Sequence, residues 1–140
     1  MKELIFIDTS AFMALNNNKD FNHKRAINWV KSMLSETVGL CTSMQVIAET
    51  ASLLKKSVSL EKSKSFLKLL ENPGIQILED SKEQQSEAWK QFMYKNENNE
   101  ATFFDYWKIA TMNYYGILKI FTFEIYFDKM EVVRIPKKIN

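Results

Sequence analysis

The chain has 140 residues, the length of one ordinary domain, and 46% of them are hydrophobic, which is enough for one sizeable core. Its 19 basic and 17 acidic residues leave a net charge of +2, too small either to indicate or to exclude a nucleic-acid partner. The single cysteine, Cys41, excludes a disulfide within the chain, and the single histidine, His23, excludes most multi-histidine zinc sites. Because the sequence has no glycine-rich phosphate loop, the chemistry of any catalytic site is expected to depend on Asp and Glu.

The first predicted element is a short strand in the N-terminal stretch MKELIFIDTS. Its apolar run at residues 4–7 has the length of a buried strand and is followed by Asp8, Thr9 and Ser10, which can begin a helix. The run is far too short for a signal peptide or a membrane span. We therefore expect a soluble, cytoplasmic protein whose first strand ends at an acid.

Helices and a second strand are predicted from there to the middle of the chain. Apolar residues at three- and four-residue spacing indicate a helix over about residues 21–34, and VGLCTS at residues 38–43 indicates a strand. We expect Ser43 to cap the next helix. The apolar face of that helix is formed by Val46, Ile47, Leu53 and Leu54. Another amphipathic helix, over about residues 60–70, ends at the sequence NPG.

Three further strands and two further helices are predicted in the second half of the chain. The strands are IQIL, IFTF and VVRI, at residues 75–78, 120–123 and 132–135. The helices are separated by the polar linker KNENNEA and cover about residues 82–94 and 103–116. Strands that alternate with helices need crossover connections, which give parallel sheets. We therefore predict a single domain over residues 1–140, a three-layer α/β/α sandwich with a central parallel sheet of four or five strands.

Acidic residues fall where such a sheet forms binding sites, beyond the carboxyl ends of its strands. Asp8 follows the first strand, and Glu124 follows the fourth. Glu49 comes three residues after Val46 and four before Leu53, so it faces the apolar side of its helix. An isolated glutamate in such a position is more often a helix-edge acid with a hydrogen bond, and this alternative stays open.

Asp105 supports two interpretations. Thr102 and Asp105 fit the Thr-x-x-Asp capping pattern, in which the acid closes back on the start of the helix. By its spacing, Asp105 also shares a partly apolar helix face with Lys108, Ile109 and Met112. The sequence leaves open whether this aspartate caps the helix or contributes to a site.

Three longer stretches of the sequence are informative as an ordered set: FIDTSAFMALNNNKDFNHKRA, VIAETASLL and TFFDYWKIATMNYYGILKIFTFEIYF. In this order the set resembles the PIN-domain ribonucleases, and among them the VapC-type toxins of toxin–antitoxin pairs. The resemblance covers nearly the whole chain and implies a compact parallel sheet between helices, with acids that gather a divalent metal for RNA cleavage. By position it implies that the catalytic acids are Asp8, Glu49, Asp105 and, where the family usually has aspartate, Glu124.

A cluster of this kind needs a cation for a physical reason. Two carboxylates about 4 Å apart repel by about 4 kcal/mol at an effective dielectric constant near 20, so several of them cannot all stay ionised unless a cation joins them. Mg²⁺, for which Mn²⁺ can substitute, prefers oxygen ligands and keeps waters that can attack a phosphodiester. We expect Asp8, Asp105 and Glu124 to bind the metal, and Glu49 to bind it or to orient the attacking water.

Two positions depart from the family pattern. Glu124 is one methylene longer than aspartate, which changes its reach toward a metal; if the loop has a different register, Asp128 takes its place. Lys108 stands one turn after Asp105, where the pattern has a small polar residue. It can pair with a carboxylate and compete with the metal, or contact substrate phosphate, but we expect its head to reach solvent, as most lysines do. Ser10 can bond a carboxylate or the scissile phosphate, or simply begin the helix.

The predicted function is a magnesium-dependent endoribonuclease that acts on RNA and is neutralised by an antitoxin protein, with a homodimer as the expected assembly. Two alternatives stay open: a housekeeping PIN nuclease of RNA processing, and a degenerate PIN domain that binds RNA or protein without cleavage. A small adjacent reading frame would separate the first function from the second. Metal-dependent cleavage would separate both from the third.

Overall fold

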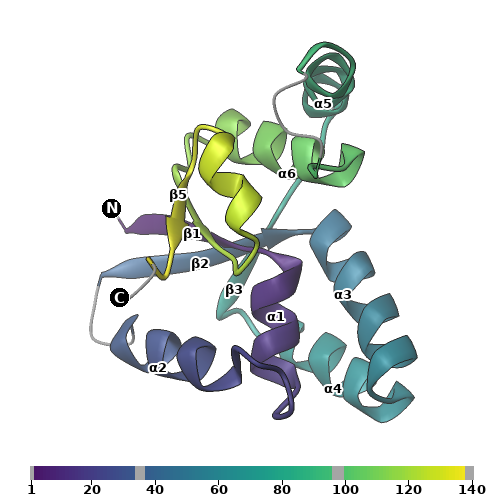
Figure 1. Ribbon diagram of the computed structural model, residues 1–140, viewed down its shortest axis with the longest axis vertical. Helices are drawn as coiled ribbons and strands as arrows, with labels where there is room; N and C mark the ends of the chain where they lie inside the picture. Colours follow the sequence, from purple (N-terminus) through teal and green to yellow (C-terminus); the bar gives the residue numbers. More distant parts are fainter. Residues whose placement is uncertain (1, 34–36, 96–99, 138–140) are drawn as a thin grey trace.

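The computed structural model describes residues 2–33, 37–95 and 100–137. Its centre is a five-stranded sheet in the order β3-β2-β1-β4-β5 (Figure 1). In chain order the strands are β1 (Glu3–Ile7), β2 (Val38–Ser43), β3 (Ile75–Leu78), β4 (Lys119–Phe121) and β5 (Val133–Ile135). Every neighbouring pair is parallel, which confirms the predicted fold class.

Helices cover both faces of this sheet. In the described ranges they are α1 (Thr9–Asn16), α2 (His23–Met33), α3 (Met44–Ser57), α4 (Leu60–Leu70), α5 (Lys82–Tyr94), α6 (Phe103–Tyr114) and the short 3-10 helix η1 (Ile125–Lys129). Figure 1 shows α1 and α2 on one side of the sheet and α5 and α6 on the other. No helix among these described residues is both long enough and apolar enough to cross a membrane.

The middle strand, β1, explains where the site forms. Ile5, Phe6 and Ile7 are at most 2% exposed, as expected of an unbroken apolar run that is covered on both faces. Strands β2 and β4 flank β1 on either side, and Ile7 at its end pairs with Phe121 at the end of β4. The residue after β1 is therefore held at the middle of the sheet's carboxyl edge.

Most predicted elements match the structure, and the differences are local. The predicted boundaries agree for residues 38–43, 60–70, 75–78 and 82–94. Leu53 was wrongly assigned to the apolar face of its helix, because it lies at the edge of that face and is 39% exposed. Ser43 does occupy the N-cap position of α3, but its side chain makes no capping hydrogen bond. The predicted linker lies mostly outside the described residues.

Candidate active site

Asp8 and Thr122 are brought together by the pairing of β1 with β4. The Asp8 backbone N–H donates to the Phe121 carbonyl at 3.0 Å, so the residues that follow the two strands lie side by side. The Thr122 hydroxyl donates to Asp8 Oδ2 at 2.8 Å. Asp8 is only 1% exposed, although its position as the N-cap residue of α1 would allow it to face solvent. It makes no capping hydrogen bond, so its carboxylate is available to the site.

Ser10 supports Thr122 and does not reach a carboxylate. Its Oγ lies 2.9 Å from the Thr122 hydroxyl and accepts from the Phe123 backbone N–H at 2.9 Å. Because the single hydroxyl proton of Thr122 goes to Asp8, Ser10 must be the donor in the Ser10–Thr122 hydrogen bond. The prediction that Ser10 bonds a carboxylate is therefore wrong, since its proton is already used to hold Thr122.

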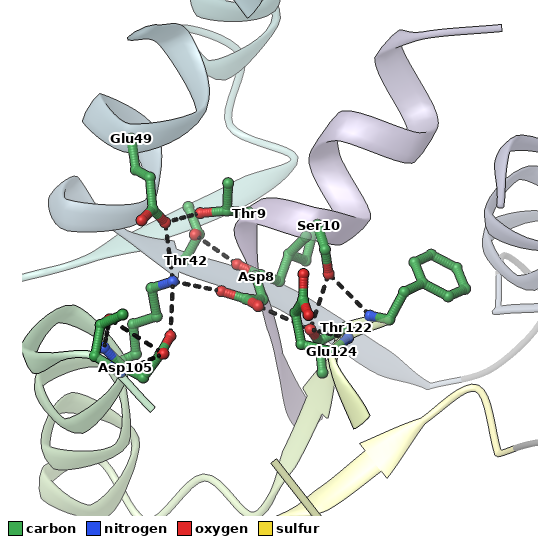
Figure 2. Close-up of polar contacts among 12 residues, drawn as sticks. Asp8, Thr9, Ser10, Thr42, Glu49, Asp105, Thr122 and Glu124 are labelled. Carbon is green, nitrogen blue, oxygen red and sulfur yellow. Dashed lines mark hydrogen bonds and ion pairs between the residues drawn. The ribbon is translucent and has the colours of Figure 1, made fainter. Parts of the chain in front are cut away.

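Glu49 reaches the same place from α3, which begins directly after β2. Val46 and Thr50 are fully buried on this helix, and between them the Glu49 side chain remains 29% exposed. The Thr9 hydroxyl donates a short hydrogen bond to Glu49 Oε1. The carboxylate is therefore fixed toward Asp8 instead of extending into water (Figure 2).

Asp105 satisfies both interpretations that the sequence left open. Its Oδ2 accepts from the Thr102 backbone N–H at 2.9 Å and from the Thr102 hydroxyl at 3.1 Å, while the Asp105 N–H donates back to that hydroxyl. Tyr126 also donates to Oδ2, at 2.9 Å. The capping box of α6 thus holds one carboxylate oxygen and leaves Oδ1 facing the cluster.

Lys108 lies at the centre of the three carboxylates. Its Nζ is 2.9 Å from Asp8 Oδ1, 2.9 Å from Glu49 Oε1 and 3.4 Å from Asp105 Oδ1. The side chain is 3% exposed, so the expectation that its head reaches solvent is wrong. Apart from this ion pair, Asp8 Oδ1 is buried without a hydrogen bond from any described residue.

Electrostatics keeps this lysine charged. Burial alone lowers the pKa of Lys108, but attraction to Asp8, Glu49 and Asp105 outweighs burial and raises that pKa above its ordinary value. The same network acts on Tyr126, whose pKa is raised by burial and by the negative charge of Asp105. Tyr126 is therefore a neutral donor to the site.

Glu124 lines the opposite side of the cluster. Its backbone N–H donates to the Thr122 hydroxyl at 3.2 Å, and its side chain makes no hydrogen bond or ion pair with another described residue. Burial raises the pKa of Glu124, and repulsion from Asp8 and Asp105 raises it further. Asp128, the predicted replacement, points elsewhere and pairs with Arg134 at 2.9 Å.

These groups line one open pocket of about 440 Å³ at the carboxyl edge of the sheet. Its walls come from the start of α1, the loop after α1, α3, α6, the loop after β4 and η1. The charged lining residues are Asp8, Asp20, Glu49, Asp105, Lys108 and Glu124. The pocket thus gathers five carboxylates and one ammonium from distant parts of the sequence.

Comparison with known proteins identifies the family of the chain. The family model of the PIN domain matches residues 5–133. The chain belongs to the PIN domain family. A search of curated proteins gave no match.

Solved structures share the PIN-domain fold. The Sarcin-Ricin loop cleaving toxin VapC20 of Mycobacterium tuberculosis has a TM-score of 0.83 at 23% identity, over 92% of this chain and 96% of the toxin. VapBC2 of Rickettsia felis, bound to a promoter DNA fragment, has a TM-score of 0.72 at 14% identity, over 94% and 96%. FitAcB of Neisseria gonorrhoeae has a TM-score of 0.65 at 16% identity, over 93% and 95%.

The residues of this PIN domain fit a divalent metal, with one obstacle. All the inward-facing donors are carboxylate oxygens, which Mg²⁺ prefers, and they already converge on one cation, the Lys108 ammonium. In the described part of the chain, no three Asp, Glu, His or Cys side chains are arranged as ready metal ligands. Lys108 accounts for this, since it occupies the point at which their oxygens meet.

Sequence reasoning missed three supporting residues of the PIN-domain site, of which Thr9 donates its hydroxyl to Glu49. Thr122, in the stretch IFTFEIYF, orients Asp8, and Tyr126, two residues after Glu124, holds Asp105. Thr122 directly follows the last residue of β4, a position that could have indicated its contact with Asp8. For Tyr126 the sequence holds no such signal, because its contact depends on the path of η1.

Proposed function

We propose that this PIN-domain protein is a magnesium-dependent endoribonuclease that hydrolyses RNA phosphodiester bonds, and that it is the toxin of a toxin–antitoxin pair. The observation that carries the proposal is the convergence of Asp8, Glu49 and Asp105 on a single cation position in an open pocket. Three carboxylates held this close repel one another, and the single charge of Lys108 offsets only part of that repulsion, which favours the binding of a divalent ion. In this proposal the domain acts as one unit over the whole chain.

Each carboxylate of the site has a defined role in the proposal. Asp8 Oδ1 and Asp105 Oδ1 face the centre and would hold the metal, because Thr122 and the α6 cap occupy their other oxygens. Glu124, which lines the same pocket, would complete the metal ligands, and Glu49 would bind the ion or accept a proton from the attacking water. A bound Mg²⁺ supplies Lewis acidity and a water of lowered pKa. Tyr126 and Thr122 keep the two aspartates oriented throughout.

The test is a cleavage assay on RNA with and without metal. Our first substrate is an RNA hairpin of the sarcin–ricin loop, since the solved relative VapC20 is described as cleaving that loop. We expect the parent protein to cleave in millimolar Mg²⁺ or Mn²⁺ and to stop in EDTA. Asp105→Asn should cleave about 100-fold more slowly, because it removes a ligand charge. Asp128→Asn is the matched control, since its carboxylate pairs with Arg134 outside the pocket.

Three results would contradict the nuclease assignment. The first is cleavage that continues in EDTA, and the second is parent-like cleavage by Asp105→Asn. A parent protein that binds metal but cleaves no RNA, neither the hairpin nor a total RNA pool, would also remove it.

We further propose a protein antitoxin and a homodimeric assembly as partners. The solved relatives with this fold include VapBC complexes and FitAB bound to DNA fragments, which supports looking for an antitoxin here. The product of a small adjacent reading frame should copurify with the chain and stop RNA cleavage. An active enzyme whose neighbouring gene products do not bind it would favour the housekeeping nuclease instead.

A degenerate, non-cleaving PIN domain is the second candidate, and Lys108 is the observation that favours it. An ammonium that already neutralises part of the cluster can replace the metal structurally. In that case metal should change neither thermal stability nor RNA binding. Metal-dependent cleavage by the parent protein would exclude this candidate.

A further inference from the structure

Lys108 uses its ammonium to pair with three carboxylates at once. A lysine ammonium has three N–H donors, and each of three carboxylates places one oxygen within 3.4 Å of Nζ. The side chain is nearly inaccessible to solvent, and it comes from α6, one turn after Asp105. The ammonium therefore occupies the position toward which the acidic side chains are oriented.

The oxygens that bind Lys108 are the ones that a metal needs. Asp8 Oδ2 is occupied by Thr122, and Asp105 Oδ2 is occupied by Thr102 and Tyr126. The remaining inward oxygens of both aspartates contact Lys108. A divalent ion would need the same oxygens and the same place as the ammonium, and two cations so close together would repel strongly.

We propose that Lys108 is a tethered cation that competes with the divalent metal for these carboxylates, so that the metal binds only when the ammonium leaves the centre. The inference rests on the proposed function, because it concerns the same metal site. Its consequence is quantitative. The apparent metal affinity of the parent protein equals the intrinsic affinity of the site multiplied by the fraction of molecules in which Lys108 has left the centre.

Glu124 provides a place for the displaced ammonium. Its carboxylate lines the same open pocket and has no hydrogen bond or ion pair to another described residue. Attraction to Lys108 already opposes the rise in the pKa of Glu124 that burial and the aspartates cause. With the metal at the centre, Glu124 can bind the ion through one carboxylate oxygen and accept from the displaced ammonium through the other, so both cations keep negative partners.

The experiment compares metal binding by the parent, Lys108→Met and Lys119→Met. Methionine keeps the length of the side chain and removes its charge. Lys119 pairs with Glu3 at 3.1 Å on the surface and is the matched control. Isothermal titration with Mg²⁺ and Mn²⁺ should give a Kd about tenfold or more lower for Lys108→Met than for the parent, and a parent-like Kd for Lys119→Met.

A second measurement uses the parent protein alone and does not depend on the variant folding. The Nζ resonance of Lys108 is followed by NMR during metal titration, because a buried ammonium exchanges its protons slowly. We expect metal to shift this signal or to accelerate its exchange with water as the ammonium leaves the carboxylates. An unchanged Lys108 signal throughout the titration, or a Kd for Lys108→Met equal to or above that of the parent, overturns the proposal.

The two proposals fail in different ways. If the parent cleaves RNA with metal while Lys108→Met binds metal no more tightly, the nuclease function stands and the tethered cation is refuted. If Lys108→Met gains metal affinity while no protein cleaves RNA, the tethered cation stands and the nuclease function is refuted.

Discussion

Replacing Lys108 by methionine should destabilise the metal-free protein, and the structure sets the size of the loss. At an effective dielectric constant near 20, unit charges 2.9 Å apart attract by about 6 kcal/mol, and Lys108 makes two contacts of that length and one of 3.4 Å. Desolvation of the buried charges cancels most of this attraction. Removing one partner of a buried ion pair usually costs about 3–5 kcal/mol. Glu49 contributes less than the aspartates, because its side chain is 29% exposed and water screens it.

Protonation of a carboxylate sets an independent upper limit on the stability that Lys108→Met can lose. The variant can relieve the repulsion by protonating one carboxylate of the cluster, which costs about 4 kcal/mol at pH 7 for an acid with an ordinary pKa near 4. We therefore expect a loss of about 3–4 kcal/mol in the free energy of unfolding. For a chain of this size, such a loss lowers Tm by about 10 °C.

The pH dependence of this loss has a defined sign. The pKa of Lys108 is raised on folding, so its stabilisation of the parent is complete below the unfolded pKa and is lost only as the pH rises through the higher folded value. The stabilisation that Lys108 gives the parent is therefore constant across neutral pH. In the variant, a carboxylate can take up a proton as the pH falls, so the deficit should shrink between about pH 8 and about pH 5.

Unfolding by urea, followed by circular dichroism in EDTA, measures both effects, with Lys119→Met as the control. A Lys108→Met protein as stable as the parent at about pH 7 would show that Lys108 does not neutralise the cluster. A deficit that grows as the pH falls would show that carboxylate repulsion is not its cause.

Two further substitutions test the walls of the pocket. Glu124→Gln should weaken metal binding and metal-dependent cleavage while Asp128→Asn leaves both unchanged; parent-like values in Glu124→Gln would make this glutamate a bystander. The pKa of Glu124 is raised on folding, so ionisation of this side chain lowers the stability of the folded protein. Without metal, Glu124→Gln should therefore be more stable than the parent at about pH 8 and lose that advantage by about pH 4. The reverse trend would refute the repulsion argument. Tyr126→Phe removes the 2.9 Å hydrogen bond to Asp105 and should lower the free energy of unfolding by about 1–2 kcal/mol; no loss in denaturant unfolding would mean that Thr102 alone holds this carboxylate.

Elements with strong local signals could be predicted from the sequence. VGLCTS and IQIL are short apolar runs between polar segments, and both form strands with the predicted boundaries. The fourth strand was harder to delimit, since β4 covers Lys119–Phe121 and the predicted run was residues 120–123. Thr122 still donates its backbone N–H to the Ile135 carbonyl at 3.0 Å, so the end of pairing is gradual there.

The meeting of three acids could also be predicted, because parallel topology places strand ends on one edge. Asp8 and Glu49 needed only their positions at a strand end and on an inward helix face. For Asp105 the sequence left open a helix cap or a position in the site, and the structure has both features: one carboxylate oxygen caps α6 and the other faces the cluster. The catalytic roles of these residues stay predictions.

The state of Lys108 could not be predicted from its neighbours in sequence. A lysine on a helix usually extends its head to solvent, and only the tertiary meeting of the end of β1 with α3 and α6 gives it three carboxylate partners, two of them buried. For the same reason, the sequence offered the pairing of Lys108 with a carboxylate only as the less favoured alternative. Lys108 supplies that partner, so the metal-free cluster is partly neutralised before any ion binds.

A crystal structure with Mn²⁺, using the anomalous signal of the metal, tests the central claim most directly. The account predicts one manganese ion in the pocket, bound by Asp8 and Asp105, with the Lys108 ammonium moved away from both aspartates toward Glu124. A manganese-soaked crystal in which Lys108 Nζ stays about 2.9 Å from Asp8 Oδ1, with no anomalous signal at the carboxylates, would contradict it.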